Sequence, residues 1–209
     1  AFSVGRTQEL LYALNQLDIE NRLPNVPIYV DSPLSREATE MLKAYPQYFN
    51  KRIRKVMEKD EDPFDFPGLK FIKTVDESKY LNVLTQPCVI ISASGMADAG
   101  RVKHHIMNNI SEEKNTILLV GYCEPRSLGG RLANGAEQVK IFGEMYEVKA
   151  EVGQMRSMSA HGDYDDLCQF LACQDPKQVR NLFLVHGEYD VQQDFAHRLL
   201  RKGFQEVVI

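Results

Sequence analysis

The chain has 209 residues, of which 44% are hydrophobic, and a formal net charge of −4 at pH 7. This length and composition suffice for one sizeable core, or for a domain with an appendage. No apolar stretch approaches the roughly 20 residues that span a bilayer, and no signal peptide is visible, so we expect no membrane partner. The negative charge argues against nonspecific attraction to nucleic acid over the whole surface, and any polyanion site must therefore be local.

The first two thirds of the chain alternate between short apolar runs and helical patterns. The predicted strands are 27–30, 71–75, 88–92 and 116–122. The predicted helices are 7–17, 36–44, 51–58, 77–84, 101–109 and 128–134. This alternation predicts an α/β fold with a mainly parallel sheet and helices on both of its faces.

The pattern changes near residue 138. From there to residue 160 polar and apolar residues alternate, with Gly143 available for a turn and Gly153 for a bulge, which predicts a long antiparallel element. Further helices are predicted at about 165–172 and 191–202, and further strands over 179–185 and 206–209. The acidic stretch 58–62, followed by two prolines, predicts a solvated loop.

The four cysteines have no CxxC spacing. Cys88 and Cys123 lie in apolar runs, and Cys168 and Cys173 fall on a predicted helix. We interpret all four as reduced packing residues of a cytoplasmic protein, not as zinc ligands.

Four predicted strand ends are each followed by a turn of small residues and then by an arginine at or near a helix start. These arginines are Arg6, Arg36, Arg101 and Arg131. Turns that follow parallel strands emerge at one edge of a sheet, where helix N-termini and arginines bind phosphate. One such turn is ordinary capping beside a solvated arginine, but the repetition favours single-stranded nucleic acid. Ser94 and Gly95 belong to these turns, and Tyr122 is placed either to stack a base or simply to pack.

Two short motifs near the C-terminus contain histidine. His161 lies in Ser-Ala-His-Gly-Asp-Tyr (159–164) and His186 in Leu-Val-His-Gly-Glu (184–188). Each is placed at a predicted strand-to-helix turn, where metals and phosphates are often bound. Either histidine alone is compatible with a packed core residue. The pair, each with an acidic residue two positions on, predicts half of a metal site.

These two motifs closely resemble the last two signature motifs of the β-CASP ribonucleases, a branch of the metallo-β-lactamase superfamily. Three further stretches fit the same family, in the same order. They are 5–11, 94–96 with Gly100-Arg101, and 121–123 leading to 128–132. The resemblance implies a β-CASP domain over 1–156, followed over 157–209 by C-terminal strand and helix elements of the αββα metallo-β-lactamase fold.

The resemblance also implies roles for the two histidines in a zinc-dependent ribonuclease that uses two zinc ions. His186 is implied to be a zinc ligand, and His161 to contact the scissile phosphate and to be a candidate general acid. RNA-processing members carry histidine at the last motif where DNA-processing members typically carry valine, so His186 favours RNA. Asp163 could in part replace an orienting carboxylate, but its position favours a helix N-cap.

The family's main zinc ligands, in a His-x-His-x-Asp-His motif, are not found in this sequence, and His104-His105 lacks that spacing. We therefore expect a piece of a longer enzyme that alone holds no stoichiometric zinc and is inactive, while a homodimer of the full-length protein stays open. One alternative is a noncatalytic RNA-binding scaffold paralogue, against which both retained histidines count. Another is a nucleotide- or phosphosugar-binding α/β domain, for which no GxGxxG or GxxxxGK[ST] pattern is present.

Overall fold

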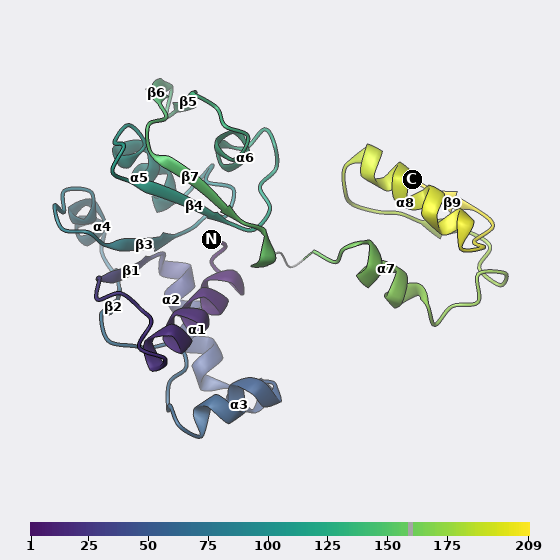
Figure 1. The fold of residues 1–209 in the computed structure, drawn as a ribbon, viewed down its shortest axis with the longest axis horizontal. Helices are drawn as coiled ribbons and strands as arrows, with labels where there is room; N and C mark the ends of the chain where they lie inside the picture. Colours follow the sequence, from purple (N-terminus) through teal and green to yellow (C-terminus); the bar gives the residue numbers. More distant parts are fainter. Residues whose placement is uncertain (159–160) are drawn as a thin grey trace. The chain divides into compact units, whose positions relative to one another are not determined.

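The computed structural model describes residues 1–158 and 161–209, and the chain divides into two compact units, Ala1–Ser159 and Ala160–Ile209 (Figure 1). The helices of the N-terminal unit are α1 (Arg6–Ile19), α2 (Pro33–Ala44), α3 (Lys51–Met57), α4 (Val75–Leu81), α5 (Arg101–Asn109) and α6 (Leu128–Ala133), with 3₁₀ helices η1 (Pro46–Tyr48) and η2 (Arg156–Met158). Its strands are β1 (Ile28–Asp31), β2 (Leu69–Phe71), β3 (Val89–Ser92), β4 (Thr116–Val120), β5 (Gln138–Ile141), β6 (Glu144–Glu147) and β7 (Glu151–Met155). The C-terminal unit contains α7 (Tyr164–Leu171), β8 (Leu182–Phe183), α8 (Tyr189–Arg201) and β9 (Val207–Val208).

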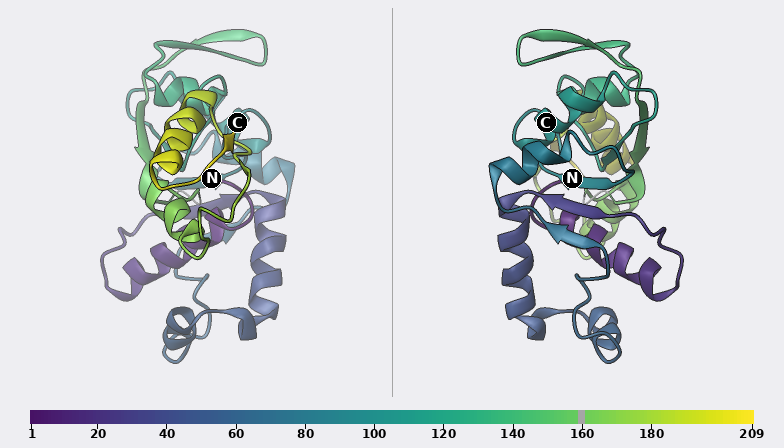
Figure 2. Two further views of the ribbon diagram at one scale, coloured as in Figure 1. Left: turned by 90° about the vertical axis from the view of Figure 1, so that its right-hand side faces the viewer. Right: turned by 90° about the vertical axis from the view of Figure 1, so that its left-hand side faces the viewer.

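A three-stranded parallel sheet in the order β2-β1-β3 lies in the N-terminal unit. Successive side chains of a strand point to opposite faces, and β1 is buried on both. Ile28 and Val30 pack in a cluster with Leu11 of α1, whereas Tyr29 packs with Leu81 of α4. Helices therefore cover both faces of this sheet, as predicted, and Figure 2 shows it from two sides.

A second parallel pair joins β4 and β7 in register from Thr116↔Glu151 to Val120↔Met155. The predicted antiparallel element is therefore wrong for β7 and right only for the hairpin β5–β6, whose turn contains Gly143. Polar and apolar alternation marks a half-buried strand but carries no information on its direction. Gly153 lies opposite Leu118 in the regular ladder, so the predicted bulge is also wrong.

Two other strand predictions differ from the structure. The predicted strand 71–75 overlaps β2 only at Phe71, and its last residue begins α4. Thr74 caps this helix by accepting a hydrogen bond from Glu77 N, while the Glu77 carboxylate accepts one from Thr74 N. The capping box favours the start of a helix here, although β-branched residues such as Val75 favour a strand. The predicted strand 179–185 contains only the two residues of β8, which pair in parallel with β9.

The described cysteines are free thiols, as predicted. The prediction that all four are packing residues is wrong for Cys173, which is exposed and lies beyond the end of α7. Burial raises the pKa of the Cys88 and Cys123 thiols, which makes them poor nucleophiles and metal ligands at neutral pH. In the part of the chain that the structure describes, no helix has the length and apolar character needed to cross a membrane.

Candidate functional site

The two motif histidines lie close together in the C-terminal unit. Their ring centroids are 6.2 Å apart and their planes are inclined by 32°. His161 precedes α7, and His186 lies between β8 and α8. Both side chains are exposed, so the interpretation as packed core histidines is wrong. The first two residues of the first motif, 159 and 160, lie outside the described residues.

The local backbone holds His186 in an unusual conformation. Its φ is +72° and that of Gly187 is +121°, so two consecutive residues leave the usual region where the chain turns toward α8. A positive φ is uncommon for a residue with a side chain and often marks a functional position. Gln192 of α8 donates hydrogen bonds to the carbonyl oxygens of Leu184 and His186, each at 3.3 Å, which stabilise this turn.

Asp163 directly precedes α7 and lies two residues after His161. Its carboxylate accepts hydrogen bonds from the backbone N–H groups of Asp165 and Asp166, both at 2.9 Å. As predicted, it is the helix N-cap.

The histidine pair fits zinc in kind but not in number. Imidazole nitrogen is a common zinc ligand, and protein zinc sites usually contain three or four side-chain ligands. Among the residues that the structure describes, no group of three or more His, Cys, Asp or Glu side chains could hold a metal ion. His161 and His186 could therefore supply at most two ligands of a larger set.

In the N-terminal unit, the turns predicted to bind phosphate do come together. The hydroxyl groups of Ser3 and Ser32 lie 3.3 Å apart and join the turn before α1 to the turn after β1. Gly95, after β3, packs so closely on the ring of Phe2 that an added Cβ would lie 2.6 Å from it. The carbonyl oxygen of Gly95 accepts a hydrogen bond from Cys123 Sγ at 3.3 Å. Four turns distant in sequence thus form one edge of the unit.

Close packing explains the glycine pair beside Arg131. A Cβ at Gly130 would lie 2.0 Å from the carbonyl oxygen of Glu124, and one at Gly129 would lie 3.0 Å from that of Met96. Both glycines lie inside α6, which begins at Leu128 as the predicted helix over 128–134 does, and they do not form the small-residue turn predicted before Arg131. They allow α6 to approach the neighbouring loops closely.

The four arginines have unequal environments, which the sequence pattern did not predict. Arg6 is half-buried and forms an ion pair with Glu9 on the same helix. Arg36 is half-buried and takes part in none of the ion pairs of the described residues. Within the same part of the chain, Nε of Arg131 is buried without a hydrogen-bond partner. Arg101 is part of a buried network.

The carboxylate of Asp31 is the centre of that network. The side chain is 0% exposed and accepts hydrogen bonds from Arg101 at 2.5 Å and Ser78 Oγ at 2.5 Å, while Nε2 of His105 lies 2.7 Å away. Nδ1 of His105 lies 2.8 Å from Oδ1 of Asn82. Burial alone would raise the pKa of Asp31, but the hydrogen bonds from His105, Ser78 and Arg101 outweigh it and hold the pKa below its usual value.

Sequence analysis missed this network. Asp31 was visible only as a turn residue, and His105 only as a histidine that lacks a metal-binding neighbour. The one available signal is an aspartate directly after the apolar run of β1, because a charge there needs partners if the strand end is buried. The network means that Arg101 stabilises the fold, whatever else it contacts.

The remaining predicted site residues lie on the same edge. Ser94 and Gly95 are half-buried in the loop after β3, and Tyr122 is exposed directly after β4.

Comparison with known proteins identifies the family of the chain. The chain matches the family model of the Beta-Casp domain over residues 7–132 and that of the Zn-dependent metallo-hydrolase RNA specificity domain over residues 145–209. It is 33% identical over 206 residues to Ribonuclease TTHA0252 of Thermus thermophilus, which covers 99% of this chain and 46% of that protein.

Two other relatives come from other organisms. The RNase J-like protein of Methanocaldococcus jannaschii is 32% identical over 195 residues, or 93% of this chain and 44% of that protein. Integrator complex subunit 11 of Danio rerio is 32% identical over 188 residues, or 90% of this chain and 30% of that protein. The chain thus spans less than half the length of these relatives. Because the first family model alone matches more than half of the chain, the chain belongs to the β-CASP family of metallo-β-lactamase ribonucleases.

Proposed function

We propose that this chain is the RNA-binding part and one half of the catalytic site of a zinc-dependent ribonuclease that hydrolyses RNA phosphodiester bonds. The observation that carries this proposal is the pairing of His161 and His186, with ring centroids 6.2 Å apart, in a member of this family. Retention of both histidines supports an enzyme over a noncatalytic scaffold paralogue. The RNA named in the second family model and the ribonucleases among the relatives support RNA as substrate.

Phosphodiester hydrolysis needs an activated water, neutralisation of the nonbridging oxygens and a proton for the leaving oxygen. Zinc, proposed here as two ions in the full-length protein, supplies the first two when bound. His186 is the proposed zinc ligand of this chain. His161 is proposed to contact the scissile phosphate and, when protonated, to donate a proton to the leaving oxygen.

The edge formed by the four turns is proposed to bind the RNA chain. Exposed Tyr122 offers a surface on which a base can stack, and Ser94 and Gly95 offer polar groups beside it. Arg6, Arg36, Arg101 and Arg131 are the proposed phosphate contacts.

Three further statements stay predictions from the sequence. They are a cytoplasmic location, a homodimer of the full-length protein, and a boundary near residue 156 between the β-CASP domain and the metallo-β-lactamase elements. The presence of two compact units supports a boundary in this part of the chain.

The catalytic proposal is tested by comparing the 209-residue chain with the full-length protein. The chain alone is expected to bind single-stranded RNA but to hold no stoichiometric zinc and to cleave no RNA, because two histidines are too few ligands. The full-length protein is expected to contain zinc and to lose cleavage when a chelator removes it. Metal analysis and a gel-based cleavage assay measure both. Chelator-sensitive cleavage by the chain alone would show that its own residues complete the site, and a zinc-free active full-length protein would refute zinc dependence.

The phosphate contacts are tested by salt dependence. Arg36→Gln and Arg131→Gln are each expected to weaken binding of the chain to a fluorescent oligouridylate and to lower the slope of log affinity against log salt by about 0.7, the value for one phosphate contact on a single strand. Lys79→Gln on α4 is the control, because it removes an equally positive but exposed side chain elsewhere. Fluorescence anisotropy between about 50 and 200 mM salt measures the slope. Unchanged slopes in both arginine variants would exclude these residues as phosphate contacts.

A further inference from the structure

Helix α3 concentrates positive charge in a chain whose net charge is −4. Lys51, Arg52, Arg54 and Lys55 occupy four of its seven positions, and all four are exposed. None of them takes part in an ion pair among the described residues. The acidic stretch 58–62 follows the helix but forms no ion pair with these four cations among the described residues, so they remain available to an anionic partner.

The cations are held on a fixed element. Ile53 and Met57 of α3 pack against the core cluster that contains Phe49 and Phe64, so the apolar side of the helix is anchored. The side chain of Asn50 caps the helix by accepting a hydrogen bond from Ile53 N at 3.0 Å. Because the apolar residues face the core, the charged residues between them project from the surface of the unit.

Two exposed tyrosines directly precede this helix. The rings of Tyr45 and Tyr48 have centroids 6.3 Å apart, and Tyr48 is 82% exposed. An exposed aromatic face beside uncompensated cations is the combination on which single-stranded nucleic acids bind, because bases stack on the rings while phosphates meet the charges.

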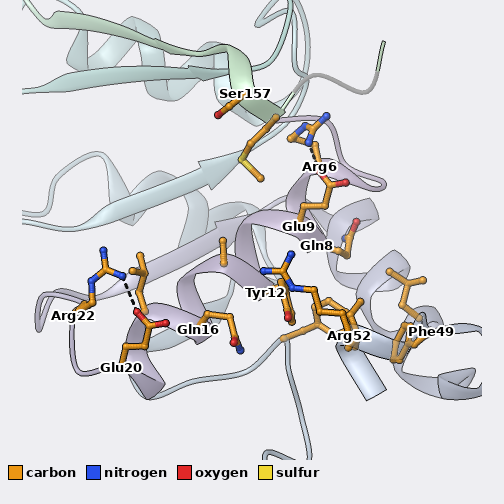
Figure 3. A pocket seen from close by; sticks show the side chains of 16 residues that line it. Arg6, Gln8, Glu9, Tyr12, Gln16, Glu20, Arg22, Phe49, Arg52 and Ser157 are labelled. Atoms are coloured by element: carbon orange, nitrogen blue, oxygen red, sulfur yellow. Dashed lines mark hydrogen bonds and ion pairs between the residues drawn. The ribbon is translucent and has the colours of Figure 1, made fainter. Parts of the chain in front are cut away.

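The charged helix also borders a groove along α1. The groove has a volume of about 790 Å³, and its lining includes Arg52 from α3, Tyr12 and Arg6 from α1, and Phe49 between η1 and α3 (Figure 3). Figure 3 shows the side chains of Tyr12 and Arg52 along it. Because the lining combines aromatic and arginine side chains, it provides both apolar and charged contacts. Arg52 therefore belongs both to the exposed helix and to the groove.

We propose that these residues form a second binding surface for single-stranded RNA, which shares Arg6 with the four turns; we name it the α3 surface. It comprises Tyr45, Tyr48, Lys51, Arg52, Arg54, Lys55 and the groove along α1. The inference deepens the proposed function and rests on it, because it takes RNA as the ligand. The exposed tyrosines favour RNA over an acidic peptide, because RNA bases stack on aromatic rings whereas an acidic peptide would bind through the cations alone. The surface would hold RNA that extends beyond the catalytic site.

The charges are tested with the variant Lys51→Gln/Arg52→Gln/Lys55→Gln of the 209-residue chain. Its control is Lys70→Gln/Lys79→Gln/Lys114→Gln, which removes three exposed lysines and leaves the same net charge. Binding of an oligouridylate of about 20 nucleotides is measured by fluorescence anisotropy over a range of salt. We expect the α3 variant to bind about tenfold or more weakly at about 50 mM salt and to lower the salt slope by about 2, with little change in the control.

The stacking contribution is tested at Tyr48. Tyr48→Ala is expected to weaken binding by about 5- to 100-fold, the usual cost of losing one aromatic base contact. Tyr48→Phe should restore most of the affinity because the ring remains. Tyr80→Ala is the control, because Tyr80 is 62% exposed but its helix, α4, contains one cation, Lys79, where α3 contains four.

Circular dichroism melting shows whether each variant folds like the parent chain. If the folded α3 variant binds RNA as the control does while Arg36→Gln and Arg131→Gln bind weakly, the α3 surface is refuted and the proposed function stands. If the parent chain binds no single-stranded RNA at about 50 mM salt, both are refuted. If the variant keeps RNA but loses binding to a polyglutamate peptide, the surface recognises acidic protein and the RNA inference is wrong.

Discussion

Replacing His186 by alanine in the full-length protein is expected to lower zinc content and RNA cleavage together. The reason is that the substitution removes a proposed metal ligand, and a zinc site that loses one of its few side-chain ligands loses affinity and geometry at once. Zinc is measured by metal analysis of the purified variant, and cleavage by the initial rate on a labelled RNA. His197→Ala on α8 is the matched control, because it removes an exposed histidine of the same unit and should leave both quantities unchanged.

His161→Ala distinguishes the proposed role of His161 as a general acid from the proposed role of His186 as a zinc ligand. Zinc should remain, while the cleavage rate falls by about 10²- to 10⁴-fold, the usual range for the loss of a positioned acid or base. RNA binding at the four turns should survive in both variants, because neither histidine belongs to those turns. Loss of zinc in His161→Ala with retention in His186→Ala would reverse the assignments. Full cleavage by both variants would refute the nuclease proposal.

The second large effect is expected on stability, at Asp31. Asp31→Ala leaves the buried ring of His105 and the guanidinium of Arg101 without their shared acceptor. Breaking a buried ion pair costs about 3–5 kcal/mol, and because Arg101 is 20% exposed we expect a loss of about 3 kcal/mol in the free energy of unfolding. Urea denaturation followed by circular dichroism measures it.

Glu113→Ala is the control for Asp31→Ala, because the side chain of Glu113 is exposed. It should change the free energy of unfolding by no more than about 0.5 kcal/mol. An equally small cost for Asp31→Ala would show that the network does not stabilise the fold.

The same carboxylate predicts a dependence of stability on pH. The pKa of Asp31 is lowered in the folded chain, so the folded state binds its proton less readily than the unfolded state. This contribution is fully present well above the unfolded pKa of about 3.9 and is lost as the pH falls through the lower folded value.

The difference in stability between the parent chain and Asp31→Asn should therefore shrink as the pH is lowered from about 6 to about 3. Glu77, whose pKa is lowered by hydrogen bonds from the Thr74 and Lys73 backbone, is present in both proteins and cancels in this comparison. A constant difference over this range would show that Asp31 does not titrate in the folded chain with a lowered pKa.

The arginines show most clearly that a charged residue can have a structural role that the sequence does not reveal. Sequence reasoning treats a guanidinium at a helix start as solvated and expects little effect of its removal on folding. For Arg101 this expectation is wrong, because the buried carboxylate of Asp31 holds its side chain. Arg101→Ala would therefore change both folding and RNA binding, and it does not test the phosphate contacts as cleanly as Arg36→Gln.

The sequence alone determined what depends on neighbouring residues. The helical pattern of residues predicted α5 (Arg101–Asn109) at its observed bounds. The two histidine motifs predicted that His161 and His186 belong to one site, and their rings lie near each other. Alternation of strand and helix predicted the class of fold, since such units bury both faces of a parallel sheet.

Only the tertiary structure decided what depends on residues far apart in the chain. The parallel pairing of β7 with β4 follows from the path of the intervening chain, because alternation is the same in either direction. Asp31 contacts Ser78 and His105, which are 47 and 74 positions away in the sequence. Nothing in the sequence around these residues indicates that contact. Packing of Ile53 and Met57 against the core likewise decided which side of α3 remains exposed, and with it where the unpaired cations lie.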